Sequence, residues 1–386
     1  MTAVSADTSV VTALRKIRTP QKQRNREFWL LLFAVAISAA ALTLVQLGAL
    51  GAIDPMIFVI GGILAALAFA LHVVLRVVAS DADPFVVPIA TLLTGLGIAM
   101  IYRIDIAKGL TGWDAFSSKQ LAWTGISIAG AIAVVILLRN YRVLYRFTYI
   151  FGLVGIVLLL LPFVPGLRAS GSNADVWVSL GGFISFQPGE LAKICLAIFF
   201  AGYLVRTRES LSSVGKKFLG ITWPRMRELG PVVVVWLISL GIIVTQRDLG
   251  TGTLIFGMFV AMLYVATGKT SWVLIGLGMV AAGVAVATQV LSYVQGRFTN
   301  WLFLFDADKV DPQGAGYQPM QGLFGLAHGG LIGTGWGQGR PQITPLAHSD
   351  YIITSLGEEL GIVGLFAILC LYMVFISRGL RIGLAG

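Results

Sequence analysis

The sequence has few charged residues, cysteines and histidines, and each shortage argues against a class of protein. Only 12% of its 386 residues are charged, whereas 57% are hydrophobic, which is far from the mixture found in a soluble domain. Its two cysteines, Cys195 and Cys370, both lie within apolar runs, so no disulfide framework is expected. The three histidines lack metal-ligand spacing, and there is no Walker loop or dinucleotide fingerprint. We therefore expect no zinc site, no nucleotide and no haem.

Long apolar runs occupy most of the chain. Because about 20 apolar residues cross a bilayer as a helix, the sequence predicts an all-α polytopic membrane protein with about ten transmembrane helices. The candidate spans are 28–47, 57–78, 84–103, 120–138, 147–165, 187–205, 230–246, 250–267, 271–292 and 356–377. The net charge of +10 lies mainly in the gaps between these runs, which favours anionic lipid over nucleic acid as its partner.

The distribution of Lys and Arg predicts the orientation in the membrane. Residues 1–27 are polar and basic and form a predicted tail whose beginning is expected to be disordered, with no cleavable leader. Further bases gather in 139–146 and 206–227. By the positive-inside rule these segments are cytoplasmic, so residues 165–186 and 293–355 are extracytoplasmic. We expect a multi-pass protein of the cytoplasmic (inner) membrane with its N-terminus in the cytoplasm.

The long interval 293–355 contains acids, bases, aromatics and turn residues between two apolar runs. Long intervals of this kind are usually functional. At its centre, Pro312 biases the backbone of Asp311 to an extended conformation, and Gly314 and Gly316 permit turns that are closed to other residues. Asp311 is therefore the candidate general base. The alternative is an ordinary Asp-Pro turn residue.

Polar side chains at the ends of other spans are candidates for substrate binding. Glu190 and Lys193, which follow Gln187, are three residues apart and share one helix face. They form either a functional intramembrane pair or a purely architectural one. Asp248 either caps the next helix, which we favour, or contributes to a phosphate or metal site. Trp177 is either an interfacial anchor or the floor of a sugar-binding cleft.

Three bases lie close to predicted span ends on the outer side: Lys119, Arg297 and Arg103. Each could bind a phosphate group. The default interpretation is a base whose long side chain reaches the lipid headgroups.

Taken together and in order, five motifs resemble the SEDS family of peptidoglycan glycosyltransferases, which includes RodA and FtsW. They are Phe186-Gln-Pro-Gly-Glu190-Leu-Ala-Lys193, Asp248-Leu-Gly-Thr, Asp311-Pro-Gln-Gly-Ala-Gly-Tyr317-Gln318, Gly329-Gly-Leu-Ile-Gly-Thr-Gly-Trp336, and Ala347-His-Ser-Asp350-Tyr-Ile with Gly357-Glu-Glu-Leu-Gly361.

The resemblance divides the chain after the tail. Residues 28–80 are an extra N-terminal transmembrane pair, similar to that of the longer actinobacterial RodA-like members. Residues 81–386 are the SEDS core, with the extracytoplasmic catalytic loop at 293–355. The family core of ten spans continues for two more helices, so the resemblance implies that this core is incomplete at its C-terminal end.

The resemblance implies polymerisation of lipid II into β-1,4-linked glycan at the outer membrane face, for cell-wall synthesis and cell shape. Asp311 would be the general base and undecaprenyl pyrophosphate the leaving group, with or without a divalent cation, Mg or Mn. A class B penicillin-binding protein, which is a transpeptidase, and other elongation or division proteins would be partners. The implied substrate-binding residues are Trp177, Gln187, Glu190, Lys193, Asp248, Arg297, Tyr317, Gln318 and Lys119.

Two other functions remain open at this point. A flippase for lipid-linked precursors would use Glu190 and Lys193 to line its path, and it should tolerate the loss of Asp311 better than the loss of Lys193. A non-catalytic membrane scaffold for a transpeptidase is the second alternative.

Overall fold

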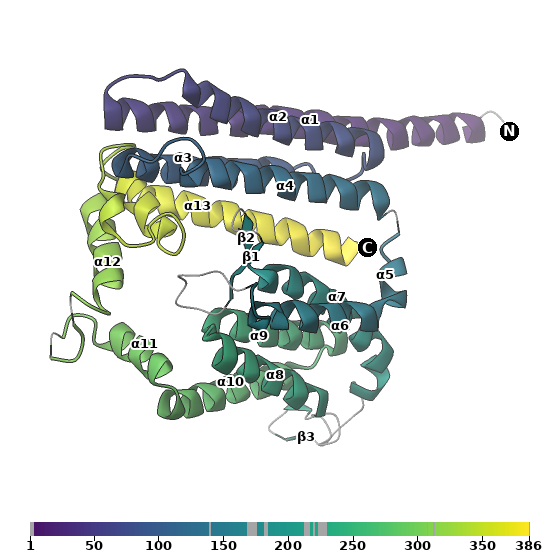
Figure 1. The fold of residues 1–386 in the computed structure, drawn as a ribbon. Helices are drawn as coiled ribbons and strands as arrows, with labels where there is room; N and C mark the ends of the chain where they lie inside the picture. Colours follow the sequence, from purple (N-terminus) through teal and green to yellow (C-terminus); the bar gives the residue numbers. More distant parts are fainter. Residues whose placement is uncertain are drawn as a thin grey trace. The chain divides into compact units, whose positions relative to one another are not determined.

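The structure, a computed structural model, is built almost entirely from helices. It describes residues 4–138, 140–167, 176–180, 184–211, 217–218, 221–222, 230–306, 308–311 and 313–385. The chain divides into two compact units (Figure 1), and each is treated by itself below. Unit 1 comprises Met1–Arg139 and Phe303–Gly386, and unit 2 comprises Asn140–Leu302.

Unit 1 is a bundle of long helices. Its elements are α1 (Val4–Leu50), α2 (Met56–Val78), α3 (Val86–Lys108), α4 (Phe116–Leu137), α12 (Tyr317–Gly329), the short 3-10 helix η3 (Pro341–Ile343) and α13 (Ile352–Ala385). Helix α1 packs along α2 and α3, and α13 packs against α3 and α12. Apolar side chains such as Leu42, Ile98 and Met100 are buried in its core.

Unit 2 contains the middle of the chain. Its elements are α5 (Val143–Arg146), α6 (Thr148–Leu160), η1 (Leu161–Phe163), β1 (Val178–Leu180), β2 (Ile184–Phe186), α7 (Pro188–Leu211), β3 (Lys217–Phe218), β4 (Ile221–Thr222), α8 (Gly230–Gln246), α9 (Leu249–Thr267), α10 (Thr270–Val290) and α11 (Ser292–Leu302). The strands form two short antiparallel pairs, β1 with β2 and β3 with β4. Helix α7 packs against α6 and α9, where the rings of Phe200 and Phe259 lie 4.9 Å apart.

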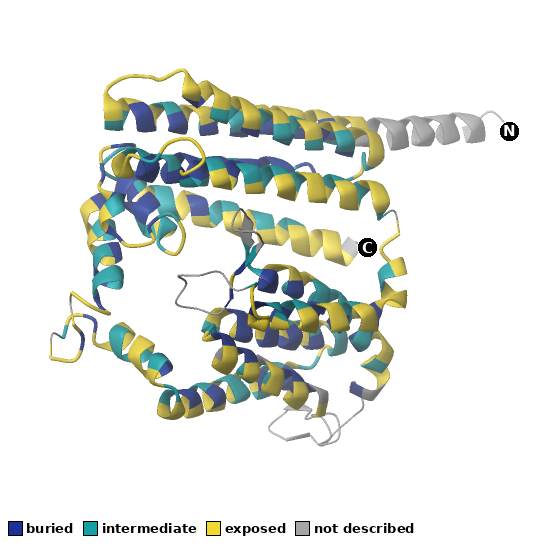
Figure 2. Cartoon of the chain, in the orientation of Figure 1, coloured by how far each residue is buried: buried dark blue, intermediate teal, exposed yellow. Residues whose placement is uncertain are grey.

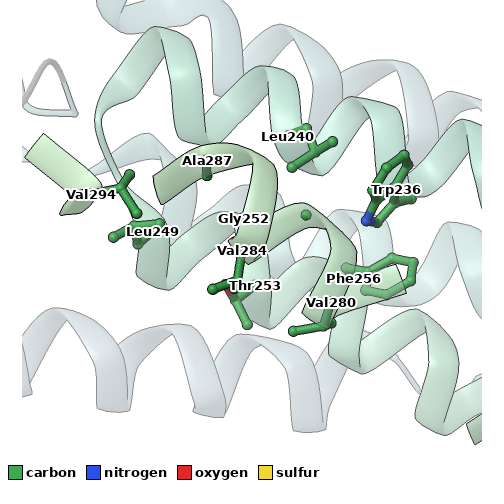
Figure 3. Close-up of a pocket in the computed structure, with 11 residues that line it drawn as sticks. Trp236, Leu240, Leu249, Gly252, Thr253, Phe256, Val280, Val284, Ala287 and Val294 are labelled. Atoms are coloured by element: carbon green, nitrogen blue, oxygen red, sulfur yellow. The ribbon is translucent and has the colours of Figure 1, made fainter. Parts of the chain in front are cut away.

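Residues of α8 to α11 line a small, partly open apolar pocket of about 50 Å³ (Figure 3). Trp236 of α8 lines it and donates its indole N–H to the carbonyl oxygen of Met279 in α10 at 3.1 Å. The indole also packs beside Gly283 of α10, where an added Cβ would be in van der Waals contact with it at 3.4 Å. Its lining is mainly apolar and offers few groups that could orient a polar ligand, so we assign no site to it.

The prediction of an all-α multi-pass membrane protein is confirmed. Every predicted span is helical in the structure, and eight helices of the described part are long and apolar enough to cross a membrane. Helices α6 and α8 are apolar but shorter. Figure 2 shows exposed residues along α2, α4 and the second half of α13, and these include large apolar side chains such as Phe58, Leu137 and Leu380. Such faces suit contact with lipid.

The predicted disordered beginning of the tail is wrong, because α1 begins at Val4. Segment 4–27 contains Ala, Leu, Lys, Arg and Gln, which all have good helix propensity. Contacts with α2 also fix the last turn of this polar segment. Arg24 and Glu27 are buried and paired, and Glu27 lies 2.8 Å from His72 of α2.

The interval 293–355 also contains more regular structure than its sequence suggested. Helix α11 fills its beginning, and α12 follows the Asp311 region. Helix α12 packs closely on α13 through glycines, since a Cβ on Gly329 would lie 2.2 Å from the carbonyl oxygen of Gly357. Helix α13 is itself interrupted at Gly361, which has a φ of 69°. At this break the amide of Ile362 donates to the carbonyl of Gly330 at 3.0 Å.

Candidate functional site

Asp311 lies on a tight turn that presents its carboxylate at the surface of unit 1. Its Oδ1 accepts a hydrogen bond from the backbone N–H of Gln313 at 2.9 Å. Its carbonyl oxygen accepts from the amides of Gly314 at 3.2 Å and Gly316 at 3.0 Å. Pro312 lies outside the described residues. The turn therefore fixes the Asp311 backbone while one carboxylate oxygen, Oδ2, makes no hydrogen bond within the described part of the chain.

Neighbouring side chains leave little space for a side chain at two glycines of this turn. A Cβ on Gly314 would lie 2.5 Å from Oδ2 of Asp311, and a Cβ on Gly316 would lie 2.6 Å from Cγ1 of Val310. Contacts this short force one of the two atoms to move. Neither glycine has a positive φ, so the predicted backbone reason for glycine is wrong, and the close contacts of the missing Cβ atoms favour glycine here instead.

We predict that Gly314→Ala lowers the rate of the reaction that uses Asp311 by about 10²-fold, which is the size expected for displacing a catalytic group by about 1 Å. The fold should persist, because the carboxylate rather than the backbone must move. The turnover rate would be compared with that of Gly130→Ala, a matched change in α4 where an added Cβ meets no atom within 4 Å. Equal rates for the two variants would contradict the prediction.

The other predicted residues of unit 1 lie on neighbouring elements. Tyr317 and Gln318 open α12, and Gln318 donates its side-chain N–H to the carbonyl oxygen of Pro345 at 3.0 Å. This bond ties the start of α12 to the segment before α13. Lys119 is exposed in the first turn of α4, with its Nζ 5.9 Å from the ring centroid of Phe116. Within the described residues, it makes no ion pair with Asp311.

In unit 2, Glu190 and Lys193 form the predicted ion pair at the start of α7. Lys193 Nζ lies 2.8 Å from the Glu190 carboxylate, with 21% of the Lys193 side chain exposed and 61% of that of Glu190. Lys193 is therefore the more buried member of the pair, and Glu190 is the more exposed one. The structure confirms the pairing predicted from the three-residue spacing.

Asp248 caps α9, as the sequence favoured. Its Oδ1 accepts from the backbone N–H of Thr251 at 3.0 Å. The start of α9 lies beside the start of α7, since an added Cβ on Gly189 would be 3.9 Å from the Thr251 methyl group and 3.8 Å from the Gln187 amide. Gln187, the Glu190–Lys193 pair and Asp248 therefore belong to two adjacent helix N-termini, which favour bound anions.

An apolar cavity of about 360 Å³ lies further along α7 in the same unit. Leu196, one turn beyond Lys193, lines it, together with Phe199 and Phe200 and side chains from α6, α8 and α9. A charged pair followed by an apolar cavity on the same helix suits a ligand with a polar head and a hydrocarbon tail.

Trp177 and Arg297 are not brought to the Glu190–Lys193 pair by any described hydrogen bond. Trp177 directly precedes β1 and is 41% exposed, and Arg297 is exposed on α11. Residues 171–175, which come just before Val176 and Trp177, lie outside the described residues. The substrate-binding roles of Trp177 and Arg297 therefore remain predictions.

Sequence reasoning missed a buried network that involves Arg103. Arg103 was interpreted as a phosphate-binding or headgroup base, which is wrong, because its side chain is 9% exposed and pairs with Glu359 of α13 at 3.2 Å. It also donates to the carbonyl oxygen of Gly339 at 2.7 Å. The neighbouring Glu358 accepts from the amide of Arg340 at 2.8 Å. The sequence did contain one signal of this network. Glu358 and Glu359 lie next to each other in an apolar run, and charged side chains within a membrane span are costly unless they are paired.

His348 stacks on Phe116, with ring centroids 3.8 Å apart and planes within 12°. Its Nδ1 is buried and has no hydrogen-bond partner among the residues that the structure describes. Burial lowers the pKa of His348 below its usual 6.5, and the Lys108 charge lowers this pKa further, while Asp105 and Asp350 act against the shift. The folded state therefore favours the neutral ring.

We predict that this histidine makes the protein less stable in acid. Between the lowered folded pKa and about 6.5, the unfolded chain binds more protons, so stability present above pH 6.5 is lost as the pH falls through the folded pKa. His348→Phe, which keeps an aromatic stack, should reduce the fall in thermal midpoint between about pH 7.5 and 5.5. Identical falls in the two proteins would contradict this prediction.

No described group of three or more His, Cys, Asp or Glu side chains is placed to hold a metal ion. The divalent cation that the family resemblance implies therefore stays a prediction, and no step below is assigned to it.

The fold is that of a polytopic helical membrane protein. It carries the Asp311 carboxylate on a surface turn of unit 1 and the Lys193 ammonium group at the start of α7 in unit 2. The family model of the FtsW, RodA and SpoVE cell cycle proteins matches residues 83–385. The chain belongs to this family, as its motifs suggested.

Named relatives agree with this assignment. The chain is 41% identical over 366 residues to the peptidoglycan glycosyltransferase RodA of Mycobacterium tuberculosis, covering 94% of this chain and 77% of that protein. It is 31% identical over 310 residues to the probable peptidoglycan glycosyltransferase FtsW of a Geobacter species, covering 78% and 79%. A solved structure from a peptidoglycan synthase complex covers 85% of this chain and 78% of its own, at 21% identity and a TM-score of 0.46.

Proposed function

We propose that this chain is a peptidoglycan glycosyltransferase that polymerises lipid II into β-1,4-linked glycan strands. The observation that carries the proposal is the exposed Asp311 carboxylate on its hydrogen-bonded turn, in a chain 41% identical to a RodA protein along 94% of its length. A base at the surface of a membrane protein can meet a sugar whose lipid carrier stays in the bilayer.

In the proposed reaction, the 4-hydroxyl of the acceptor sugar attacks the anomeric carbon of the donor. A new C–O bond forms, the bond from this carbon to undecaprenyl pyrophosphate breaks, and Asp311 accepts the hydroxyl proton. An α-linked donor that gives a β-linked product requires one inversion, so a single base is sufficient. General base catalysis contributes about 10²–10⁴-fold to such rates.

The groups of unit 2 are proposed to bind the lipid-linked substrate. The ammonium group of Lys193, held by Glu190 at 2.8 Å, and the N-terminus of α7 attract a pyrophosphate group. The apolar cavity that begins at Leu196 suits a prenyl chain. The remaining predicted substrate-binding residues, Trp177, Arg297, Tyr317, Gln318 and Lys119, keep that role in the proposal.

The orientation and the partners belong to the same proposal. Concentration of Lys and Arg in 1–27, 139–146 and 206–227 supports a cytoplasmic N-terminus in the inner membrane. Asp311 would then face the outer leaflet. A class B penicillin-binding protein is the proposed partner, because a glycan polymerase works together with an enzyme that crosslinks its product.

The test is polymer formation by the purified full chain. Fluorescent lipid II would be supplied in detergent and in vesicles, with and without a class B penicillin-binding protein, and the products separated by gel electrophoresis. Strands that a muramidase degrades are expected. Absence of polymer in both arms, with lipid II moving across the vesicle membrane instead, would favour the flippase and overturn the proposal.

A further inference from the structure

Helices α1 and α2 precede the part of the chain that the family model matches, which begins at residue 83. Nothing in the proposed reaction uses them. The last turns of α1 nevertheless contact the segment 330–340, here called the glycine loop, which lies between α12 and α13.

The contact is made by backbone on both sides. A Cβ on Gly48 of α1 would lie 2.1 Å from the carbonyl oxygen of Trp336 and 3.0 Å from Cα of Gly337. From the other side, a Cβ on Gly337 would lie 2.7 Å from both the amide nitrogen of Ala49 and the carbonyl oxygen of Val45. Neither position has room for a side chain, and backbone atoms cannot turn away as a flexible side chain does.

Two further contacts fix α1 at this end of unit 1. Gln46 is fully buried and donates to the Tyr102 hydroxyl of α3 at 2.7 Å, while its Oε1 accepts from the amide of Asp54 at 2.9 Å. The Trp336 side chain packs against two buried clusters, one that includes Leu42 and Val45 of α1 and one that includes Met100 of α3. The end of α1 is therefore specifically positioned, and the glycine loop lies against it.

The opposite side of the glycine loop is bound to α13. The amide of Gly337 donates to Oε2 of Glu359 at 2.9 Å, and the amides of Thr334 and Gly335 donate to the carbonyls of Glu358 and Glu359, both at 3.0 Å. The loop directly continues α12, and α12 begins where the Asp311 turn ends. A displacement of the loop is therefore transmitted along one short, closely packed helix.

We propose that the end of α1 positions the glycine loop and, through α12, the Asp311 turn, with Gly48 as the positioning residue. The part of this inference that concerns catalysis rests on the proposed function. It assigns a role in the reaction to a helix that lies outside the family core.

The experiment uses Gly48→Val in the full chain, with Gly62→Val as its matched control. Gly62 lies on α2, where an added Cβ meets no atom within 4 Å. We expect Gly48→Val to lower kcat about 10²-fold per folded molecule. KM for lipid II should change less than kcat, because Glu190 and Lys193 of unit 2 are not touched, whereas Tyr317 and Gln318 open α12 and move with it. Gly62→Val should match the wild type. A purely structural role would lower thermal stability and yield without changing kcat per folded molecule.

Amide hydrogen exchange supplies a readout that needs no activity. In Gly48→Val, exchange should accelerate at Gly335 and Gly337 in the glycine loop and at Gly314 and Gly316 in the Asp311 turn. Wild-type kcat in this variant, or unchanged exchange in the glycine loop, would overturn the inference. If the wild-type chain makes no polymer, the proposed function fails, and the exchange measurement still decides whether α1 positions the loop.

Discussion

Asp311→Asn is expected to lower polymer formation from lipid II by about 10²–10⁴-fold, because an amide cannot accept the hydroxyl proton. The turn itself should survive. The Asn Oδ1 can still accept the hydrogen bond that Asp311 receives from the amide of Gln313 at 2.9 Å. The rate would be measured with purified protein and fluorescent lipid II, alongside the thermal midpoint to show that the fold is unchanged.

Asp308→Asn is the matched control for this change. Asp308 is exposed, lies three residues earlier in the same segment, and its carboxylate makes no ion pair within the described residues. We expect this variant to polymerise lipid II at the wild-type rate. Full activity of Asp311→Asn would remove Asp311 as the base, and equal losses in both variants would indicate that the charge of the segment matters instead.

Arg103→Met is expected to cause a large loss of stability. It leaves the Glu359 carboxylate, which is fully buried, without its cation. Breaking a buried pair by removing one partner costs about 3–5 kcal/mol. The free energy of unfolding would be measured by denaturation of the detergent-solubilised protein and compared with that of Arg378→Met, whose pair with Asp83 is longer, at 3.4 Å, and more exposed. A smaller effect is expected for this control.

A second variant separates the buried charge from general damage to the core. In Arg103→Met with Glu359→Gln, the buried group is neutral, and the Gln side-chain oxygen can still accept from the amide of Gly337. This double variant should recover part of the stability that Arg103→Met loses, as expected for two coupled residues. A loss equal to the sum of the two single changes would show that the charges do not interact.

Local features of the fold and site were predictable from the sequence because neighbouring residues determine them. The apolar runs gave the helices, since each is long enough to cross a bilayer. The three-residue spacing gave the Glu190–Lys193 pair, and the position of Asp248 before an apolar run gave the cap of α9. Gly314 and Gly316 beside Asp311 indicated a tight turn, which the hydrogen bonds of Asp311 confirm.

The errors concern regions where distant segments meet. Helix α12 was not expected, because 293–355 was interpreted as an extracytoplasmic loop. Its packing on α13 through Gly329 depends on a helix that follows later in the chain. Arg103 was interpreted as a surface base because it lies near the end of a predicted span. Its actual partner, Glu359, is 256 residues away, and no periodicity or local spacing connects the two.

The sequence by itself determined a helical membrane protein, its candidate base and the local geometry around that base, because each depends on residues within one or two turns. Only the tertiary structure decided that Arg103 pairs with Glu359 and that Gly48 meets Trp336. Both contacts depend on how α1, α3 and α13 pack, and that packing follows from the shapes of surfaces assembled from distant parts of the chain.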